Sequence, residues 1–385
     1  MSIGKCSTGS SSEVVKTPIG KAGKFYFTYF PQLDGFRGLA IILVLIGHYD
    51  LSHLGPLGGF GVLCFFVLSG FLITGLLCAE NSTSGNVDLR QFYLRRALRI
   101  LPAFLVFLVI ATVLIATHRI TDVPWYTVLV SFLYLNNIFG RGYSLGHLWS
   151  LSLEEQFYAL WPCTFKKLGE RGALRLAAAL VILISVIRGA AIYLKLFEYH
   201  SSVFYERPWF RFDSILIGCC IAIWLNKRTR IGIIEQARRW MHPSLLLPIA
   251  VMWTLWAERI PALRPFYLTI QMALAAAMLF HVVIVPEGIW SRFLSHDSLR
   301  FVGRISYSVY LWQQLFMISN VPDWGWIRVF PYNVLASVAV GIASHYLIER
   351  PFLRLKRSLA KPKASAVGRL HLAPESASTI SMSAV

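Results

Sequence analysis

The chain has 385 residues, of which 56% are hydrophobic and only 15% are charged, and its mean hydropathy is +0.58. A soluble protein of this length needs more charge to cover its surface, so the composition argues against a soluble domain and indicates a polytopic membrane protein. The net charge of +18 does not indicate a nucleic-acid-binding protein, because the basic residues lie beside the ends of apolar segments and not along one exposed face.

Apolar runs of membrane-spanning length recur along the chain, and they predict an all-α polytopic membrane protein with about ten transmembrane helices. The predicted spans are about 38–54, 60–79, 98–117, 146–165, 173–194, 208–225, 244–259, 266–285, 302–320 and 331–350. A further apolar stretch, 125–140, is short and contains Asn136 and Asn137. We expect this stretch to re-enter the membrane or to lie at its interface, beside a cavity on the outer side.

The positions of lysine and arginine set the expected orientation. With a cytoplasmic amino terminus and 125–140 not spanning, 28 of the 37 basic residues fall on the cytoplasmic side and seven on the outer side. This bias follows the positive-inside rule and predicts a multi-pass protein of the plasma (inner) membrane with both termini cytoplasmic. The expected parts are a cytosolic tail (1–29), a membrane domain (30–352) and a basic, disordered cytosolic tail (353–385).

The first predicted span carries two ionisable groups, Arg37 and His48. On a helix these residues lie within about 20° of each other and about 16 Å apart along the axis. Ionisable groups inside a membrane usually face the bundle interior. Arg37 is interpreted either as a positive-inside anchor or as part of a site. His48 is interpreted either as an interhelical hydrogen-bonding group or as a general base.

An Arg-x-x-Arg pair, Arg96 and Arg99, opens the third predicted span. The spacing places both guanidinium groups on one helix face at the cytosolic side. Such a pair suits a phosphorylated ligand from the cytosol, and it is also typical of a positive-inside anchor.

The fourth predicted span begins with HLWSLSLEEQFY, residues 147–158. Two adjacent carboxylates, Glu154 and Glu155, cannot both be ionised cheaply inside a membrane, so at least one needs a cationic partner or a proton. The i,i+4 spacing predicts that Ser150, Glu154 and Tyr158 share one face, with Glu155 turned away. A structural polar seam between helices is the alternative interpretation.

Arg211 and Asp213 are two residues apart, so they do not face each other on a helix, and we expect each to pair elsewhere. The segments 303–307 (GRISY) and 349–351 (ERP) are interpreted mainly as structural.

Taken together, these motifs resemble the membrane acyltransferase 3 family. The resemblance covers about residues 30–352 and rests on seven motifs in the family's order. These are Arg37-x10-His48, CFFVLSGFLIT (64–74), Arg96-x-x-Arg99, HLWSLSLEEQFY (147–158), RFDSILIG (211–218), GRISYSVYLW (303–312) and IERPF (348–352). One departure is Gln313, which stands where many relatives continue YLW with histidine.

The resemblance implies a ten-helix enzyme that moves an acyl group, usually acetyl, from cytosolic acetyl-CoA to a hydroxyl of an extracytoplasmic glycan. It implies that His48 is catalytic, that Arg37 is essential, and that Arg96 and Arg99 lie near the CoA phosphates. Arg37 could contribute to both roles. We expect an acyl-CoA donor, no metal, and no nucleic-acid partner.

Within this scheme we expect His48 to remove the acceptor proton, and Glu154 or Glu155 to orient the imidazole. Four further residues are candidate substrate-binding groups: His147, Trp149, Ser150 and Tyr158. The sequence leaves open whether transfer is direct or passes through an acyl-histidine.

The resemblance implies a glycan acceptor such as exopolysaccharide, O-antigen or lipo-oligosaccharide, and members of the family also modify peptidoglycan. The alternatives are a transporter of a glycan or small anion without covalent chemistry, and a non-catalytic membrane scaffold or sensor.

Overall fold

The computed structural model describes residues 30–49, 54–199, 202–226, 243–317 and 325–359, and every regular element in these ranges is a helix. The predicted tail 1–29 lies outside the described residues, as do residues 360–385. The first elements are α1 (Pro31–His48), α2 (Gly55–Ser84), α3 (Leu89–Ala116), α4 (Tyr126–Phe132), α5 (Asn136–Phe139), α6 (Leu148–Tyr193), α7 (Ser202–Glu206) and α8 (Pro208–Asn226). They are followed by α10 (Pro243–Trp256), η1 (Ala257–Arg259), η2 (Pro261–Leu263), α11 (Arg264–Ile284), α12 (Ile289–Leu294), α13 (Asp297–Met317), η3 (Gly325–Arg328), α14 (Tyr332–Ser344), η4 (His345–Glu349) and α15 (Arg350–Leu359).

The all-α prediction is confirmed for the described residues, whereas the count of ten spans is not. By length and composition, five helical segments of the described chain could cross a membrane: Gly55–Ser84, Leu89–Ala116, Leu148–Tyr193, Val203–Asn226 and Pro261–Ile284. The described parts of the other predicted spans also fall mainly in helices, but these helices are shorter or more polar; residues 50–53 and 318–320 of those spans lie outside the described part of the chain. The segment 353–359, predicted as part of a disordered tail, forms the end of α15.

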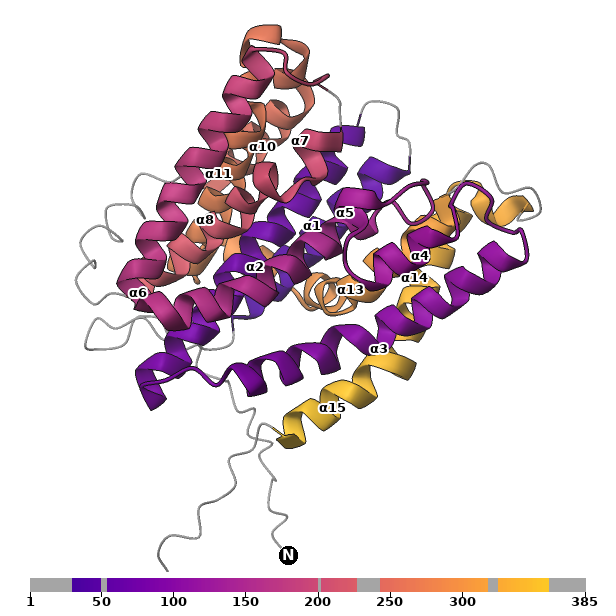
Figure 1. Cartoon of the computed structure of the whole chain (residues 1–385), viewed down its shortest axis with the longest axis horizontal. Helices are drawn as coiled ribbons and strands as arrows, with labels where there is room; N and C mark the ends of the chain where they lie inside the picture. Colours follow the sequence, from indigo (N-terminus) through magenta and orange to yellow (C-terminus); the bar gives the residue numbers. More distant parts are fainter. Residues whose placement is uncertain (1–29, 50–53, 200–201, 227–242, 318–324, 360–385) are drawn as a thin grey trace, which may run out of the picture.

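The helices pack around a central pair, α1 and α2. In Figure 1, α8, α10 and α11 lie on one side of this pair, and α3, α14 and α15 lie on the other. Helix α1 packs on α2 and α13, helix α2 packs on α8, and helix α13 packs on α14. Helices α3 and α15 run side by side along one edge (Figure 1).

Two glycine contacts let the central helices approach closely. A Cβ atom on Gly303 of α13 would collide with the Asp34 carbonyl oxygen of α1, and one on Gly70 of α2 would collide with the Ile215 carbonyl oxygen of α8. In lipid there is no hydrophobic driving force between helices, so helices associate through close van der Waals packing. Small residues at the crossings allow the backbones to approach closely enough for this packing. The register of α1 on α13 and of α2 on α8 is therefore fixed.

Helix α6 is two helical arms joined at Gly169, whose φ of 64° and ψ of 176° break the helical path. Glycine reaches this left-handed conformation without a steric penalty. Figure 1 shows the two arms running in different directions from one corner. The two arms correspond to the two predicted spans 146–165 and 173–194.

The segment 125–140 does not form one continuous span. It folds into the two short helices α4 and α5, and Asn136 and Asn137 are buried. The Asn136 amide donates to the Leu145 carbonyl at 2.7 Å, and the Arg207 guanidinium donates to the Asn137 carbonyl at 3.0 Å. The backbone amide of Asn136 donates to Ser152, and Arg207 also donates to the Ile138 carbonyl, so these backbone groups have partners within the protein, as irregular backbone at membrane depth requires.

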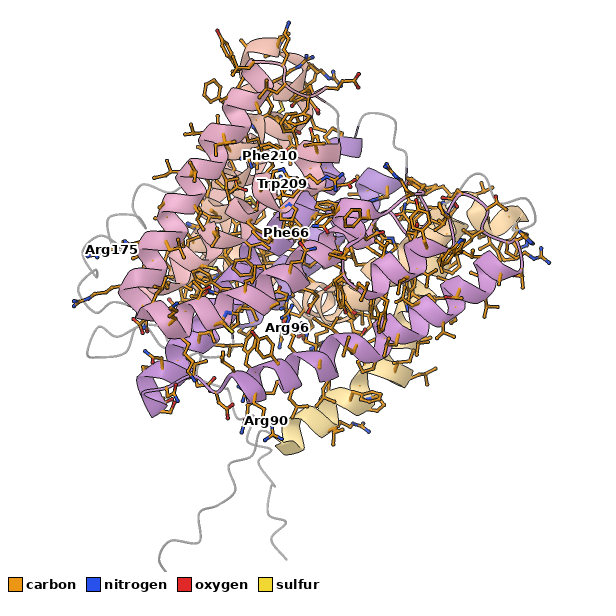
Figure 2. The ribbon with its side chains drawn as sticks, in the orientation of Figure 1. Phe66, Arg90, Arg96, Arg175, Trp209 and Phe210 are labelled. Atoms are coloured by element: carbon orange, nitrogen blue, oxygen red, sulfur yellow. The ribbon has the colours of Figure 1, made fainter. Side chains whose placement is uncertain are left out.

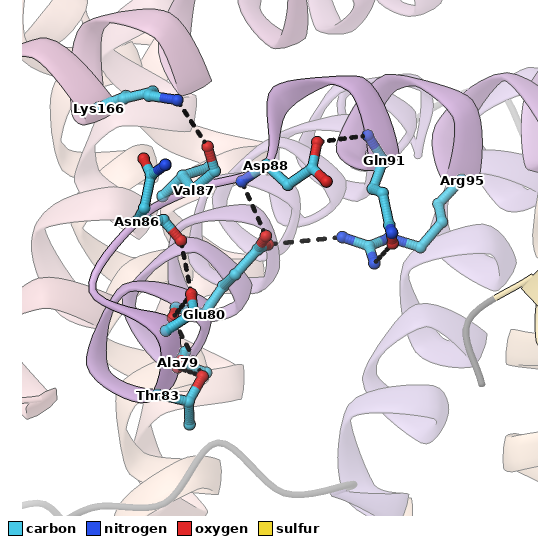
Figure 3. Close-up of polar contacts among 10 residues, drawn as sticks. Ala79, Glu80, Thr83, Asn86, Val87, Asp88, Gln91, Arg95 and Lys166 are labelled. Atoms are coloured by element: carbon cyan, nitrogen blue, oxygen red, sulfur yellow. Dashed lines mark hydrogen bonds and ion pairs between the residues drawn. The ribbon is translucent and has the colours of Figure 1, made fainter. Parts of the chain in front are cut away.

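A polar network fixes the start of α3 (Figure 3). The Asp88 carboxylate accepts a hydrogen bond from the Gln91 amide at 3.0 Å and so caps the helix. Glu80 of α2 accepts from the Asp88 amide at 2.9 Å and pairs with Arg95 at 3.4 Å, while Lys166 of α6 donates to the Val87 carbonyl at 2.9 Å. This network sets the position of the Arg96–Arg99 turn that follows.

Candidate active site

A cavity of about 490 Å³ lies between α1, α2, α3, the first arm of α6, and α13. Its apolar lining comes mainly from α2, and its polar lining comes from all five helices. The polar side chains are Asp34, Arg37, Ser69, Arg96, Arg99, Ser150, Glu154, Tyr158, Ser306, Tyr307 and Tyr310. A cavity of this size with a few convergent polar groups has the character of a ligand site.

The three predicted arginines, Arg37, Arg96 and Arg99, all line this cavity, but their partners differ. The Arg37 guanidinium lies 3.8 Å from the Asp34 carboxylate. The Arg96 guanidinium is 3.3 Å from the Glu155 carboxylate and lies 3.1 Å from the centroid of the Tyr158 ring. In Figure 2, Arg96 lies between α3 and α6.

Arg99 differs from the other two arginines. Within the described part of the chain it forms no hydrogen bond or ion pair, although it lines the cavity. A guanidinium group has five N–H donors and remains charged at any physiological pH. Arg99 is therefore the cavity cation that is most ready to receive an anionic ligand.

The predicted division between the two adjacent glutamates is confirmed. Glu154 lines the cavity together with Ser150 and Tyr158, and it accepts a hydrogen bond from Ser69 at 2.6 Å. Glu155 points elsewhere and pairs with Arg96. One carboxylate thus faces the ligand space, and the other neutralises a cation.

His48 is the last residue of α1, and its ring does not line the cavity. Its Nδ1 atom lies 2.7 Å from the Val44 carbonyl oxygen. Because a carbonyl oxygen can only accept, Nδ1 carries the hydrogen, and in the neutral ring Nε2 has the free lone pair. The imidazole is therefore held in the tautomer of a base.

The expected orientation of His48 by Glu154 or Glu155 stays a prediction. In the described structure Glu154 accepts a hydrogen bond from Ser69, Glu155 pairs with Arg96, and the imidazole is hydrogen-bonded to the Val44 carbonyl. The physical reason for this last contact is that His48 ends α1 and folds back on its own preceding turn. The Val44 carbonyl, one helical turn earlier, orients the imidazole in this structure.

His147 and Trp149 lie outside the cavity, but they contact residues that line it. The His147 Nε2 atom donates to the Leu311 carbonyl of α13 at 3.0 Å, and its ring is close enough to His48 for an electrostatic interaction. Trp149 packs edge-on against the cavity residue Phe66, with 5.8 Å between the ring centroids. Phe66 is labelled in Figure 2.

Sequence reasoning missed four hydroxyl-bearing cavity residues: Ser69, Ser306, Tyr307 and Tyr310. Two of these, Tyr307 and Tyr310, are three residues apart on α13 and hence on one helix face. The i,i+3 spacing of the two tyrosines was the signal that could have identified them. The segment 303–307, which contains Tyr307, is instead interpreted mainly as structural in the sequence analysis. Gln313 is fully buried, and its amide has no hydrogen-bond partner among the described residues.

Asp213 pairs away from Arg211, as predicted. Its carboxylate lies 2.7 Å from the guanidinium of Arg188, in the second arm of α6, and both side chains are at most 1% exposed. Arg211 is also buried, and it lies 5.8 Å from the centroid of the Phe66 ring.

The described residues contain no group of three or more histidine, cysteine, aspartate or glutamate side chains that could hold a metal ion.

The sequence of residues 30–349 matches the model of the acyltransferase domain family. The chain therefore belongs to this acyltransferase 3 family, as its motifs predicted. It is 29% identical over 348 residues to the O-acetyltransferase OatA of Staphylococcus aureus, covering 84% of this chain and 57% of that protein.

Two further relatives have names that refer to peptidoglycan. The peptidoglycan O-acetyltransferase OatA of Listeria monocytogenes is 29% identical over 356 residues, which cover 86% of this chain and 56% of that protein. YrhL of Bacillus subtilis, provisionally named a peptidoglycan O-acetyltransferase, is 30% identical over 353 residues, which cover 84% and 55%. The chain thus spans little more than half the length of these relatives. No solved structure matches it.

Proposed function

We propose that this protein is a membrane O-acetyltransferase that moves an acetyl group from cytosolic acetyl-CoA to a hydroxyl of an extracytoplasmic glycan. The proposal rests on one observation: a single cavity is lined both by Arg99, which has no partner among the described residues, and by the hydroxyl groups of Ser150 and Tyr310. These hydroxyl groups contact His147, which lies within electrostatic range of His48. Such an arrangement offers a cation to a phosphorylated donor at one end and a base to an acceptor at the other.

Peptidoglycan is the acceptor that we propose. The names of two relatives support it, and they favour it over the exopolysaccharide, O-antigen or lipo-oligosaccharide acceptors expected from the motifs. Ten spans, a location in the inner membrane and cytoplasmic termini belong to the same proposal, because the distribution of basic residues favours them.

In the proposed reaction, the CoA phosphates bind Arg99, with Arg37 and Arg96 adding positive charge. The pantetheine arm follows the apolar wall formed by Phe65, Leu72 and other α2 residues. The acceptor hydroxyl approaches from the outer side, and His48 Nε2 takes its proton. Ser150, Glu154 and Tyr158 contact the donor in the cavity, while His147 and Trp149 support the outer end. Direct transfer and an acyl-histidine intermediate both fit this scheme.

The chain of 385 residues in lipid nanodiscs is expected to release CoA thiol from acetyl-CoA when soluble peptidoglycan fragments are added. Acetyl-labelled donor should leave the label on the glycan as an ester that mild base removes. A transporter would move glycan without consuming acetyl-CoA. Glycan flux in proteoliposomes without thiol release would therefore contradict the proposal.

Replacing Arg99 by glutamine is expected to raise the KM for acetyl-CoA about 10- to 100-fold with little change in kcat. Charge-assisted hydrogen bonds contribute roughly 1.5–3 kcal/mol, and binding lost equally from ground and transition states appears in KM. The matched control is Arg90→Gln, because Arg90 is an exposed arginine of the same helix outside the cavity (Figure 2). Equal KM values in the two variants would remove Arg99 from the donor site.

A further inference from the structure

Two hydroxyl groups, those of Ser150 and Tyr310, form a linked pair in the cavity lining. Their oxygen atoms are 2.5 Å apart. Both also lie within hydrogen-bond distance of one carbonyl oxygen, that of His147, at 3.2 Å from Ser150 and 2.9 Å from Tyr310. The two residues come from α6 and α13, so the pair exists only where these helices meet.

The proton count of this pair leaves one O–H group available. Each hydroxyl has one hydrogen to donate, and the pair shares a single carbonyl acceptor. When one hydrogen is donated to the His147 carbonyl, the other is held only by the neighbouring hydroxyl. That second hydrogen can turn to a new oxygen atom without leaving a buried carbonyl unsatisfied.

Two other hydroxyl groups of the cavity, those of Ser69 and Tyr307, have partners that keep them in place. Ser69 donates to Glu154 at 2.6 Å, and Tyr307 donates to the Ile100 carbonyl at 3.0 Å. The Tyr158 ring lies under the guanidinium of Arg96. Ser150 and Tyr310 are therefore better placed than these to offer a hydrogen to a ligand.

The pair also lies at the histidine end of the cavity. It contacts the backbone carbonyl of His147, and the His147 ring lies within electrostatic range of His48. Ser150 precedes Tyr158 by two helical turns, about 12 Å along the axis, and Tyr158 marks the position of Arg96. A ligand held by its phosphates near the arginines would thus present its far end to Ser150 and Tyr310.

Acyl transfer places negative charge on the carbonyl oxygen of the acyl group, and this charge needs hydrogen-bond donors in a dry site. Backbone amides inside the helices are already used in helical hydrogen bonds, so side-chain donors must serve. We propose that the Ser150–Tyr310 pair donates its free O–H to the oxyanion that forms from the thioester carbonyl, so that the hydroxyl that donates is catalytic and its partner holds it in position. This assignment rests on the proposed function and deepens it.

The step balances as follows for direct transfer. His48 Nε2 takes the proton of the acceptor hydroxyl, and the acceptor oxygen bonds to the thioester carbon. The carbonyl π electrons move to oxygen, where the free O–H of the pair donates to it. When the carbonyl reforms, the carbon–sulfur bond breaks, and the CoA thiolate takes the proton from His48. Attack by His48 itself would create the same oxyanion.

Tyr310→Phe is expected to lower kcat about 100-fold, since one oxyanion donor commonly contributes that much, while the KM for acetyl-CoA changes less than twofold. Ser150→Ala is expected to behave in the same way and covers the case in which Tyr310→Phe fails to fold. Tyr267→Phe is the matched control. The hydroxyl of Tyr267, a buried residue of α11, also donates to a backbone carbonyl at 2.9 Å, here that of Thr254 outside the cavity.

A trifluoromethyl-ketone analogue of acetyl-CoA can distinguish a catalytic role of the Ser150–Tyr310 pair from a structural one. The oxygen of the adduct that this analogue forms mimics the oxyanion. Tyr310→Phe should weaken inhibition by the analogue at least tenfold while CoA itself binds as in wild type. Equal losses for the analogue and for CoA would overturn the assignment, and so would a kcat within threefold of wild type. A wild-type protein that transfers no acetyl group would instead overturn the proposed function, and this assignment with it.

Discussion

Replacement of His48 by asparagine should lower acetyl transfer by about 10²–10⁴-fold without weakening the binding of CoA. General-base catalysis typically contributes this factor, and the asparagine amide can still donate to the Val44 carbonyl but cannot accept the proton. Because His48 does not line the cavity, the donor-binding surface is retained. The measurement is thiol release together with CoA binding by calorimetry.

The control for this variant is His281→Asn. His281 is a buried histidine of α11, 3% exposed, and its ring nitrogens have no hydrogen-bond partner among the described residues. The same substitution there removes an imidazole that does not line the proposed active-site cavity. Activity of His48→Asn within tenfold of this control would exclude His48 as the base.

A second large effect is expected at Asp213, where asparagine should destabilise the protein by about 3–5 kcal/mol. Breaking a buried ion pair by removing one partner leaves a charge without compensation in a low-dielectric interior. Here the carboxylate also accepts from Ser185 and from the backbone amide of Ser214, and the paired Arg188 side chain is 1% exposed. The measurement is the thermal unfolding midpoint of the detergent-solubilised protein.

Asp297→Asn is the matched control for this substitution. Its carboxylate lies 2.8 Å from Arg300, almost the same separation as in the Asp213–Arg188 pair, but its side chain is 90% exposed. Water screens such a pair, so the midpoint should stay unchanged. A double variant, Asp213→Asn with Arg188→Gln, should recover part of the loss, because one uncompensated charge is removed. Equal midpoints for the two single variants would show that the buried pair contributes nothing.

Local spacing predicted those parts of the site that a single helix determines. Arg37 and His48 do lie on one helix, and the face that contains Ser150, Glu154 and Tyr158 does line one cavity. These predictions succeed because the helical period fixes which side chains share a face, whatever the helix packs against.

The sequence pattern could not predict contacts between segments that are distant in the chain. The i,i+2 spacing excluded a pair between Arg211 and Asp213, yet nothing in it selected Arg188, which belongs to another helix. The role of Tyr310 depends on the meeting of α13 with α6. The backbone partner of His48 depends on how a side chain turns at a helix end, where hydrophobic periodicity carries no information.

The count of spans shows the limit of hydropathy. Helices α1 and α13 have 18 and 21 residues, yet neither is among the five segments of the described chain that are apolar enough to cross a membrane. Both carry polar residues toward the cavity, such as Asp34 and Arg37 on α1 and Tyr307 and Tyr310 on α13. The residues that make these helices functional are those that lower their mean hydropathy.

The close contact of α1 with α13 has a consequence for biosynthesis. Helix α1 emerges early from the ribosome, while the wall that seals its polar face is among the last parts of the membrane region to be made. Until α13 is made, the cavity beside Arg37 lacks the wall that Ser306, Tyr307 and Tyr310 form. A nascent or prematurely terminated chain therefore has only part of this cavity.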